Sequence, residues 1–250
     1  MSILNFRLFK NFFGRSVQGA GGPAQLVSLT SLLAHWKLDE GSGTREDSHS
    51  TNQDLTDVNT VTQASGKIDE SASFAAVSNE GLSNLGSTFT LGADKTFCGW
   101  IYLEDKLLVY TFFSKWNPGE GNEYQCRYNS ITDRFEWMKG DGDVGTLETV
   151  KADTFGSPII QTWYFICCKY NHTTKIFSIS INNGAFNDGV DVGASTSSNG
   201  DFFLGRLDTA TSLPLNGRID EFSVFGRILS AGEITALFNS GDGLTYPFTA

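Results

Sequence analysis

The chain has few cysteines and few histidines. Its four cysteines, Cys98, Cys126, Cys167 and Cys168, match no C-x-x-C zinc spacing. A 250-residue chain can bury enough surface to need no disulfides. We therefore expect free thiols that pack as small apolar side chains and fold in a reducing compartment. The three histidines are scattered and form no H-E-x-x-H motif.

The chain also lacks long apolar runs and an excess of positive charge. No segment reaches the roughly 18 apolar residues that span a membrane. Arg7, Lys10 and Arg15 interrupt the apolar residues near the start, which makes a Sec signal peptide a poor fit. The formal net charge of −10 argues against a nucleic-acid partner. We read the acidic residues as a solvated surface or, in part, as ligands of a cation.

Aromatic residues and glycines are abundant, with 20 Phe and 27 Gly against only 5 Pro. Short apolar-polar alternations recur every ten to twelve residues from Leu32 to Phe225, which is typical of an all-β sandwich. Asn183-Gly184 follows the alternating run Lys175 to Ile181 and predicts a type I′ hairpin turn. Ser230 and Glu233 form a capping box, which predicts one short C-terminal helix.

Several short sequence segments, in the same order along the chain, resemble those of the concanavalin A-like, laminin-G-like jelly-roll domains. They lie at 36–43, 47–48, 66–74, 96–102, 113–116 and 217–230. The resemblance implies an all-β, two-sheet antiparallel jelly-roll sandwich over residues 24–250, with its first and last strands paired. It also implies a scaffold that binds or adheres more often than it catalyses, and that commonly holds calcium and glycans. Fold alone establishes neither ligand.

The resemblance points to Asp39 and Asp220 as ligands of a structural Ca²⁺, with Asp47 as a third candidate. Calcium needs several hard oxygen ligands, which carboxylates supply. The alternative is that Asp39 is a turn residue and that Asp220 fixes a loop by hydrogen bonding.

Exposed aromatic side chains with polar neighbours favour glycan binding. Trp116 and Tyr124 flank the polar stretch 117–123, which predicts such a platform in a loop. Packing of Trp116 in the hydrophobic core is an equally weighted alternative to this exposed position. The related jelly-roll glycoside hydrolases typically carry clustered carboxylates on one strand in the pattern E-x-D-x-x-E, which does not occur here, so we expect no enzyme activity.

Residues 1–23 differ from the rest. Ile3, Phe6, Phe9 and Phe13 recur at helical spacing among basic residues and precede a glycine-rich hinge at 18–23. Exposed phenylalanines, Phe12 included, would form an unusual apolar patch. The segment is an anchoring arm that binds a partner or, equally, a flexible terminus or one packed on its own domain. A helix on a membrane surface is least favoured.

These features lead to two functional hypotheses. The first is a non-enzymatic phage virion accessory protein, a capsid decoration or a head or tail fibre. Its arm would bind capsid or tail proteins, and its jelly roll would face outward and bind cell-surface glycans. Production in the host cytoplasm would explain the missing secretion signal, and by analogy we expect a homo-oligomer, a trimer. The alternative is a calcium-dependent carbohydrate-binding or adhesion module of a cell-surface protein.

Overall fold

The computed structural model describes residues 25–86, 88–117, 121–140, 147–193, 199–209 and 213–250. The predicted anchoring arm, including Phe6, Phe9, Phe12 and Phe13, lies outside the described residues. None of the helices in the described ranges has the length and apolar composition that a membrane crossing requires.

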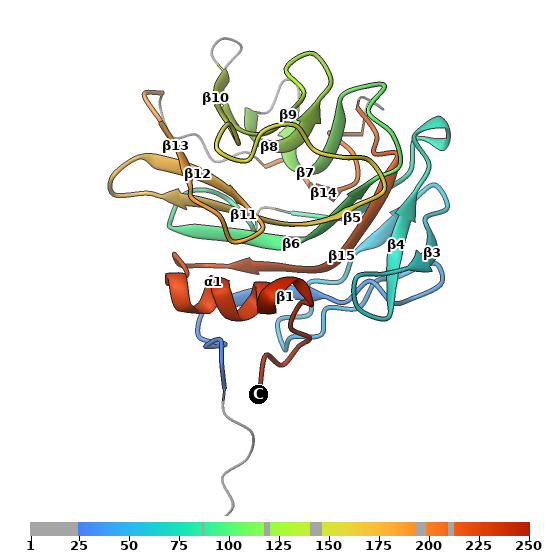
Figure 1. Ribbon diagram of the computed structural model, residues 1–250. Helices are drawn as coiled ribbons and strands as arrows, with labels where there is room; N and C mark the ends of the chain where they lie inside the picture. The colour runs from blue at the N-terminus through green and yellow to red at the C-terminus, as the bar shows by residue number, and fades with distance from the viewer. Residues whose placement is uncertain (1–24, 87, 118–120, 141–146, 194–198, 210–212) are drawn as a thin grey trace, which may run out of the picture.

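Two antiparallel sheets face each other, as the alternating sequence predicts (Figure 1). The larger sheet has the order β13-β12-β11-β6-β15-β4-β3, and β1 also pairs with β15. Its strands are β1 (Leu32–Trp36), β3 (Thr62–Ser65), β4 (Glu70–Phe74), β6 (Lys95–Leu103), β11 (Trp163–Asn171), β12 (Ile176–Ile181), β13 (Asn187–Val190) and β15 (Gly217–Phe225).

The second sheet has the order β10-β9-β8-β7-β14-β5-β2. Its strands are β2 (Thr56–Val58), β5 (Gly81–Asn84), β7 (Tyr110–Asn117), β8 (Gly121–Asn129), β9 (Arg134–Gly140), β10 (Leu147–Lys151) and β14 (Phe202–Leu204). The helical elements described are α1 (Ala231–Phe238) and the 3₁₀ turns η1 (Ala76–Ser78) and η2 (Asn239–Gly241). The predicted jelly-roll sandwich with one short C-terminal helix is therefore confirmed.

Aromatic side chains fill the space between the sheets. Trp137 lies 5.7 Å from Phe97 and 5.4 Å from Phe113 between ring centroids, and Phe113 lies 5.2 Å from Phe222. Because both sheets contribute these rings, the core holds the two layers together.

The outer face of the larger sheet carries a second apolar layer. The helix α1 covers it, and Phe238 stacks on Trp100 with ring centroids 5.9 Å apart. Cys98 and Cys167 belong to this layer, and all four cysteines are buried and free, as expected. Helix α1 thus lies across the outer face of the larger sheet. The sheet carries polar side chains on both sides of the helix.

The two ends of the chain meet in one sheet, as predicted. Trp36 of β1 lies opposite Phe222 of β15. Gln25 also forms a bridge with Thr249. Figure 1 accordingly places the first described residues and the C-terminus at the same end of the molecule.

Local signals in the sequence also hold. Ser230 accepts a hydrogen bond from the Glu233 amide, and the Glu233 side chain returns to Ser230, which completes the capping box. Asn182 and Asn183 have positive φ values of 52° and 56° in the turn after β12. This left-handed pair is what a type I′ turn needs, and it lies one residue before the predicted Asn183-Gly184 pair.

Candidate functional site

The structure brings Asp39 and Asp220 together at the β1 and β15 end of the larger sheet. A bulge interrupts the pairing of β15 with β6 after Asp220, and Glu221 has a φ of 47°. The Asp220 side chain is buried, and its Oδ2 accepts hydrogen bonds from the amides of Lys67 (2.7 Å) and Ile68 (2.9 Å). Asp39 accepts one from the Glu70 amide at 3.2 Å.

Burial raises the pKa of Asp220 to about 8, and the charges of Glu221 and Asp39 act in the same direction. The amides of Ile68 and Lys67 favour the ionised form and oppose this shift. The other carboxyl oxygen, Oδ1, is buried without a hydrogen bond. The two predicted carboxylates therefore lie close enough for their charges to interact. The Oδ1 atom of Asp220 remains free for a ligand or a proton.

Asp47 serves a different purpose. Its carboxylate accepts four hydrogen bonds, from the amides of His35, His49 and Gln53 and from the Thr51 hydroxyl. Within the described ranges, no three His, Cys, Asp or Glu side chains are grouped so as to hold a metal ion. Asp39, Asp47 and Asp220 are therefore not grouped as ligands of one ion. Calcium binding by Asp39 and Asp220 stays a prediction.

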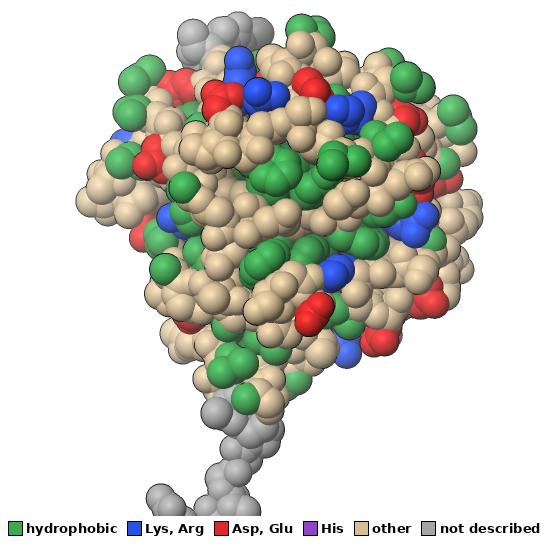
Figure 2. All heavy atoms as spheres, in the orientation of Figure 1, with side chains coloured by type: hydrophobic (Ala, Val, Ile, Leu, Met, Phe, Trp, Pro, Cys, Tyr) green, Lys and Arg blue, Asp and Glu red, His purple; other side chains and the backbone are tan. Residues whose placement is uncertain are grey.

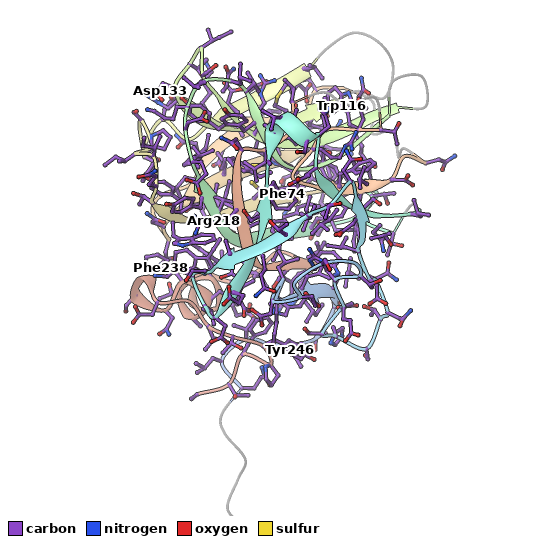
Figure 3. The ribbon with its side chains drawn as sticks, turned by 90° about the vertical axis from the view of Figure 1, so that its right-hand side faces the viewer. Phe74, Trp116, Asp133, Arg218, Phe238 and Tyr246 are labelled. Atoms are coloured by element: carbon purple, nitrogen blue, oxygen red, sulfur yellow. The ribbon has the colours of Figure 1, made fainter. Side chains whose placement is uncertain are left out.

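The predicted aromatic platform is not exposed. Tyr124 has no exposed surface, its hydroxyl donates to the Phe89 carbonyl at 2.9 Å, and its ring lies 5.4 Å from Trp137. Trp116, labelled in Figure 3, is only 8% exposed. The expectation of a glycan platform at these two positions is wrong, because strands β7 and β8 extend through the polar stretch that the sequence reads as a loop.

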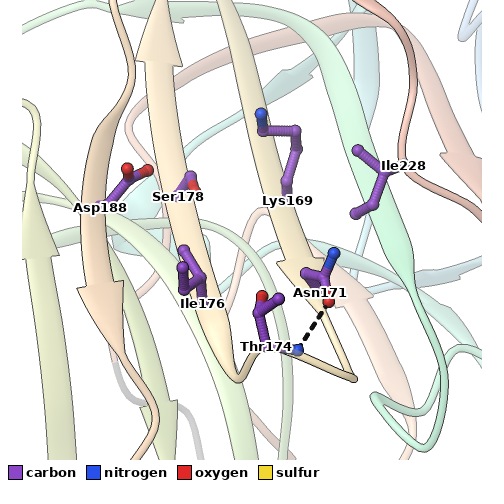
Figure 4. A pocket seen from close by; sticks show the side chains of 7 residues that line it. All are labelled: Lys169, Asn171, Thr174, Ile176, Ser178, Asp188 and Ile228. Carbon is purple, nitrogen blue, oxygen red and sulfur yellow. Dashed lines mark hydrogen bonds between the residues drawn. The ribbon is translucent and has the colours of Figure 1, made fainter.

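A pocket of about 210 Å³ lies on the outer face of the larger sheet, at its β11-β12-β13 edge (Figure 4). Its lining comes from neighbouring strands, since Lys169 pairs with Ser178 and Ser178 pairs with Asp188. The remaining lining residues are Asn171, Thr174, Ile176 and Ile228.

The polar groups of this pocket are available to a ligand. The ammonium group of Lys169 lies 3.5 Å from the centre of the Phe186 ring, and forms no hydrogen bond to a described residue. The side chains of Ser178 and Asp188 also lack hydrogen bonds within the described part of the chain. Asn171 uses its carbonyl oxygen to accept from the Thr174 amide at 2.8 Å, which leaves its amide nitrogen free (Figure 4). Asp188 is exposed, so its carboxylate is reachable from solvent.

This arrangement combines hydrogen-bond donors and acceptors with apolar walls. Lys169 and Asn171 donate hydrogen bonds, Asp188 accepts them, and Ser178 can do both. Ile176 and Ile228 supply apolar walls. Few polar groups on an apolar frame are typical of small-ligand sites, although this pocket is smaller than the usual range of roughly 300–1,000 Å³. Its size suits one small ring.

The sequence analysis missed these residues. In the alternating run from Lys175 to Ile181, neighbouring side chains point to opposite faces of the strand. Because Phe177 points into the core, this pattern could have predicted that Ser178 points to the outer face. Strand β13 was not predicted, because Asn187–Val190 contains a glycine and lacks an alternating pattern. Without β13, nothing in the sequence places Asp188 beside Ser178.

Comparison with known proteins gives the family. A family model described as the concanavalin A-like lectin/glucanases superfamily matches residues 69–235. No protein of the curated set matches the sequence.

Solved structures share the fold at low sequence identity. Domain 4 of AbnA, a GH43 extracellular arabinanase from Geobacillus stearothermophilus, in complex with arabinotriose, has a TM-score of 0.60 and 18% identity, covering 82% of this chain and 97% of that one. The binding domain of Paraclostridial Mosquitocidal Protein 1 has a TM-score of 0.65 and 17% identity, covering 85% and 52%. Trypanosoma rangeli sialidase has a TM-score of 0.61 and 12% identity, covering 86% and 34%. This chain thus spans about half of the second of these proteins and about a third of the third. The family match over residues 69–235, more than half of the chain, shows that the chain belongs to the concanavalin A-like, laminin-G-like superfamily.

Proposed function

We propose that this chain is a non-catalytic carbohydrate-binding domain and that the pocket of Lys169, Ser178 and Asp188 holds a sugar ring. The observation that carries the proposal is a pocket whose Lys169, Ser178 and Asp188 side chains form no hydrogen bond within the described part of the chain. Sugar hydroxyls both donate and accept, and these side chains can match either role. The arabinotriose bound to the similar AbnA domain makes this sugar a suitable first probe.

A binding role without catalysis agrees with the composition of the pocket. Glycoside hydrolysis commonly needs two carboxyl groups across the scissile bond, one as the acid and one as the nucleophile or base. The pocket lining contains a single carboxylate, Asp188.

Substitutions in the pocket should abolish glycan binding and leave the fold intact. We expect Asp188→Asn and Lys169→Met each to weaken binding at least tenfold on a glycan array and in titration with arabinotriose, because each removes a charged hydrogen-bonding partner. Matched controls are Asp242→Asn and Lys151→Met, which change the same residue types at exposed positions outside the pocket. Unchanged binding by both pocket variants, or no binding of the native chain to any glycan, would contradict the proposal.

We also propose that the domain is displayed on a phage virion, attached through residues 1–23 to capsid or tail proteins, as an oligomer. The apolar and basic composition of that segment supports this role. Mass spectrometry of purified virions should then detect the chain, and deletion of residues 1–23 should remove it from the particle while thermal unfolding of the domain stays unchanged. Virions that lack the native chain, or that retain the truncated one, would refute this role.

A further inference from the structure

The outer face of the larger sheet carries a second polar and aromatic surface, beyond α1 from the pocket. Trp163, Tyr102 and Arg218 lie opposite one another on β11, β6 and β15 and form a cross-strand row. The Trp163 and Tyr102 rings are 5.3 Å apart, and the Arg218 guanidinium lies 4.6 Å from the centre of the Tyr102 ring. All three side chains are half-buried, so part of each faces solvent.

Polar groups border this row, which we call the aromatic row. Arg218 donates to Glu104 at 2.8 Å and to the Ser65 carbonyl at 3.1 Å, and its Nε is buried without a hydrogen bond. The Glu104 side chain is 33% exposed. The Tyr102 hydroxyl and the Trp163 indole form no hydrogen bond within the described residues. Figure 3 shows Arg218 between Asp133 above and Phe238 below, and Figure 2 shows hydrophobic side chains gathered across the middle of the adjoining face.

The aromatic row and the pocket are separate. Lys169 lies six positions after Trp163 along β11, which at a strand rise of 3.2–3.4 Å per residue amounts to about 20 Å. Helix α1 covers the sheet between them, where Phe238 stacks on Trp100. One sugar ring cannot reach both, so each surface must engage its own part of a ligand.

We infer that the aromatic row is a second carbohydrate contact, and that the target is a polymeric or densely clustered glycan held at two points. This inference rests on the proposed function of the pocket. Aromatic rings cover the apolar faces of sugar rings. Arg218 and Glu104, whose opposite charges balance in a salt bridge, offer donors and acceptors for sugar hydroxyl groups. Two linked contacts raise overall affinity by as much as 10²–10⁴ when the ligand spans both.

The test compares native and variant chains on arrays that print the same glycans sparsely and densely. Trp163→Ala and Arg218→Gln should leave binding to sparse glycans and to free arabinotriose unchanged, and should reduce binding to dense glycans and to arabinan at least tenfold. Asp188→Asn should weaken both. Leu85→Ala, at a 77% exposed position, is the control for loss of an apolar side chain. Thermal unfolding identifies any variant that fails to fold, and Arg218→Gln, which removes no ring, then decides.

The outcomes separate the two proposals. Dense-array binding that is equal in native, Trp163→Ala and Arg218→Gln chains overturns the second contact and leaves the pocket proposal standing. Dense binding lost in the row variants but retained in Asp188→Asn would keep the row as a glycan contact and refute both the pocket and the attachment at two points. Trp, Tyr and Arg also predominate in protein interfaces. A changed oligomeric state of Trp163→Ala in sedimentation, with dense-array binding intact, would show that the row binds another protein chain.

Discussion

Replacing Tyr124 by alanine should lower the free energy of unfolding by about 3–5 kcal/mol, the range for removing a large buried ring. Tyr124 is fully buried, contacts Phe97, Phe113 and Trp137, and donates a hydrogen bond to the Phe89 carbonyl. The substitution removes apolar contacts from the centre of the core and leaves a cavity and an unpaired carbonyl. This is a large share of the roughly 5–15 kcal/mol by which domains are stable.

Denaturant unfolding at neutral pH measures this effect. Tyr124→Phe keeps the ring and loses only the hydroxyl, so it should cost about 1–3 kcal/mol. Ile131→Ala, at an 89% exposed position, should change stability by less than about 0.5 kcal/mol. If Tyr124→Ala unfolded like the native chain but lost glycan binding, Tyr124 would be an exposed platform after all.

Asp220→Asn should change how stability depends on pH. The folded-state pKa of Asp220 is raised to about 8, whereas an unfolded aspartate titrates near 3.9. The native state therefore holds a proton that the unfolded state releases, so the contribution of Asp220 to stability is full below about pH 4 and is lost as pH rises to about 8. Four pKa units correspond to about 5 kcal/mol.

Asparagine resembles the protonated acid and does not titrate. The free energy of unfolding of Asp220→Asn relative to the native chain should therefore increase by several kcal/mol from pH 4 to pH 8.5, in urea titrations at each pH. The amides of Lys67 and Ile68 can still donate to the asparagine oxygen. Asp242→Asn, at an exposed site, should run parallel to the native chain. A constant difference between Asp220→Asn and the native chain would show that Asp220 is not a proton-holding group.

The same variant tests the calcium prediction. A cation bound by Asp220 and Asp39 would stabilise the ionised carboxylates and remove the cost of their burial near pH 8. Calcium should then raise the melting temperature of the native chain but not that of Asp220→Asn. Equal melting temperatures of the native chain with calcium and with chelator would exclude a structural calcium site.

The fold could be predicted from the sequence because its strongest signals are local. The alternation in Ile176–Ile181 predicts one strand, and Ser230 and Glu233 predict a helix start. Both depend on side-chain period or hydrogen bonding over a few residues. The pairing of β1 with β15 is long-range, and only the family resemblance implied it. Strands β2, β3 and β13 lack that period and were not predicted.

The candidate site could not be predicted in the same way. Tyr124 is a residue type suited to an aromatic platform, but its exposure depends on the face of the sheet to which it points. A shift of one residue in the register of β8 would reverse that face. Asp188 reaches Ser178 only through the β12 and β13 pairing. Trp163 and Arg218 are brought together by three strands that are distant in sequence. Long-range pairing, and not residue type, creates these surfaces.

Carbohydrate binding at the β11-β12-β13 pocket can be tested residue by residue. Backbone amide chemical shifts are recorded during titration with the glycans that bind on the array and with arabinotriose. We expect saturable shifts centred on Lys169, Asn171, Ser178 and Asp188. Shifts confined to β7, β8 and β9 of the second sheet, or no shifts at saturating glycan, would contradict it.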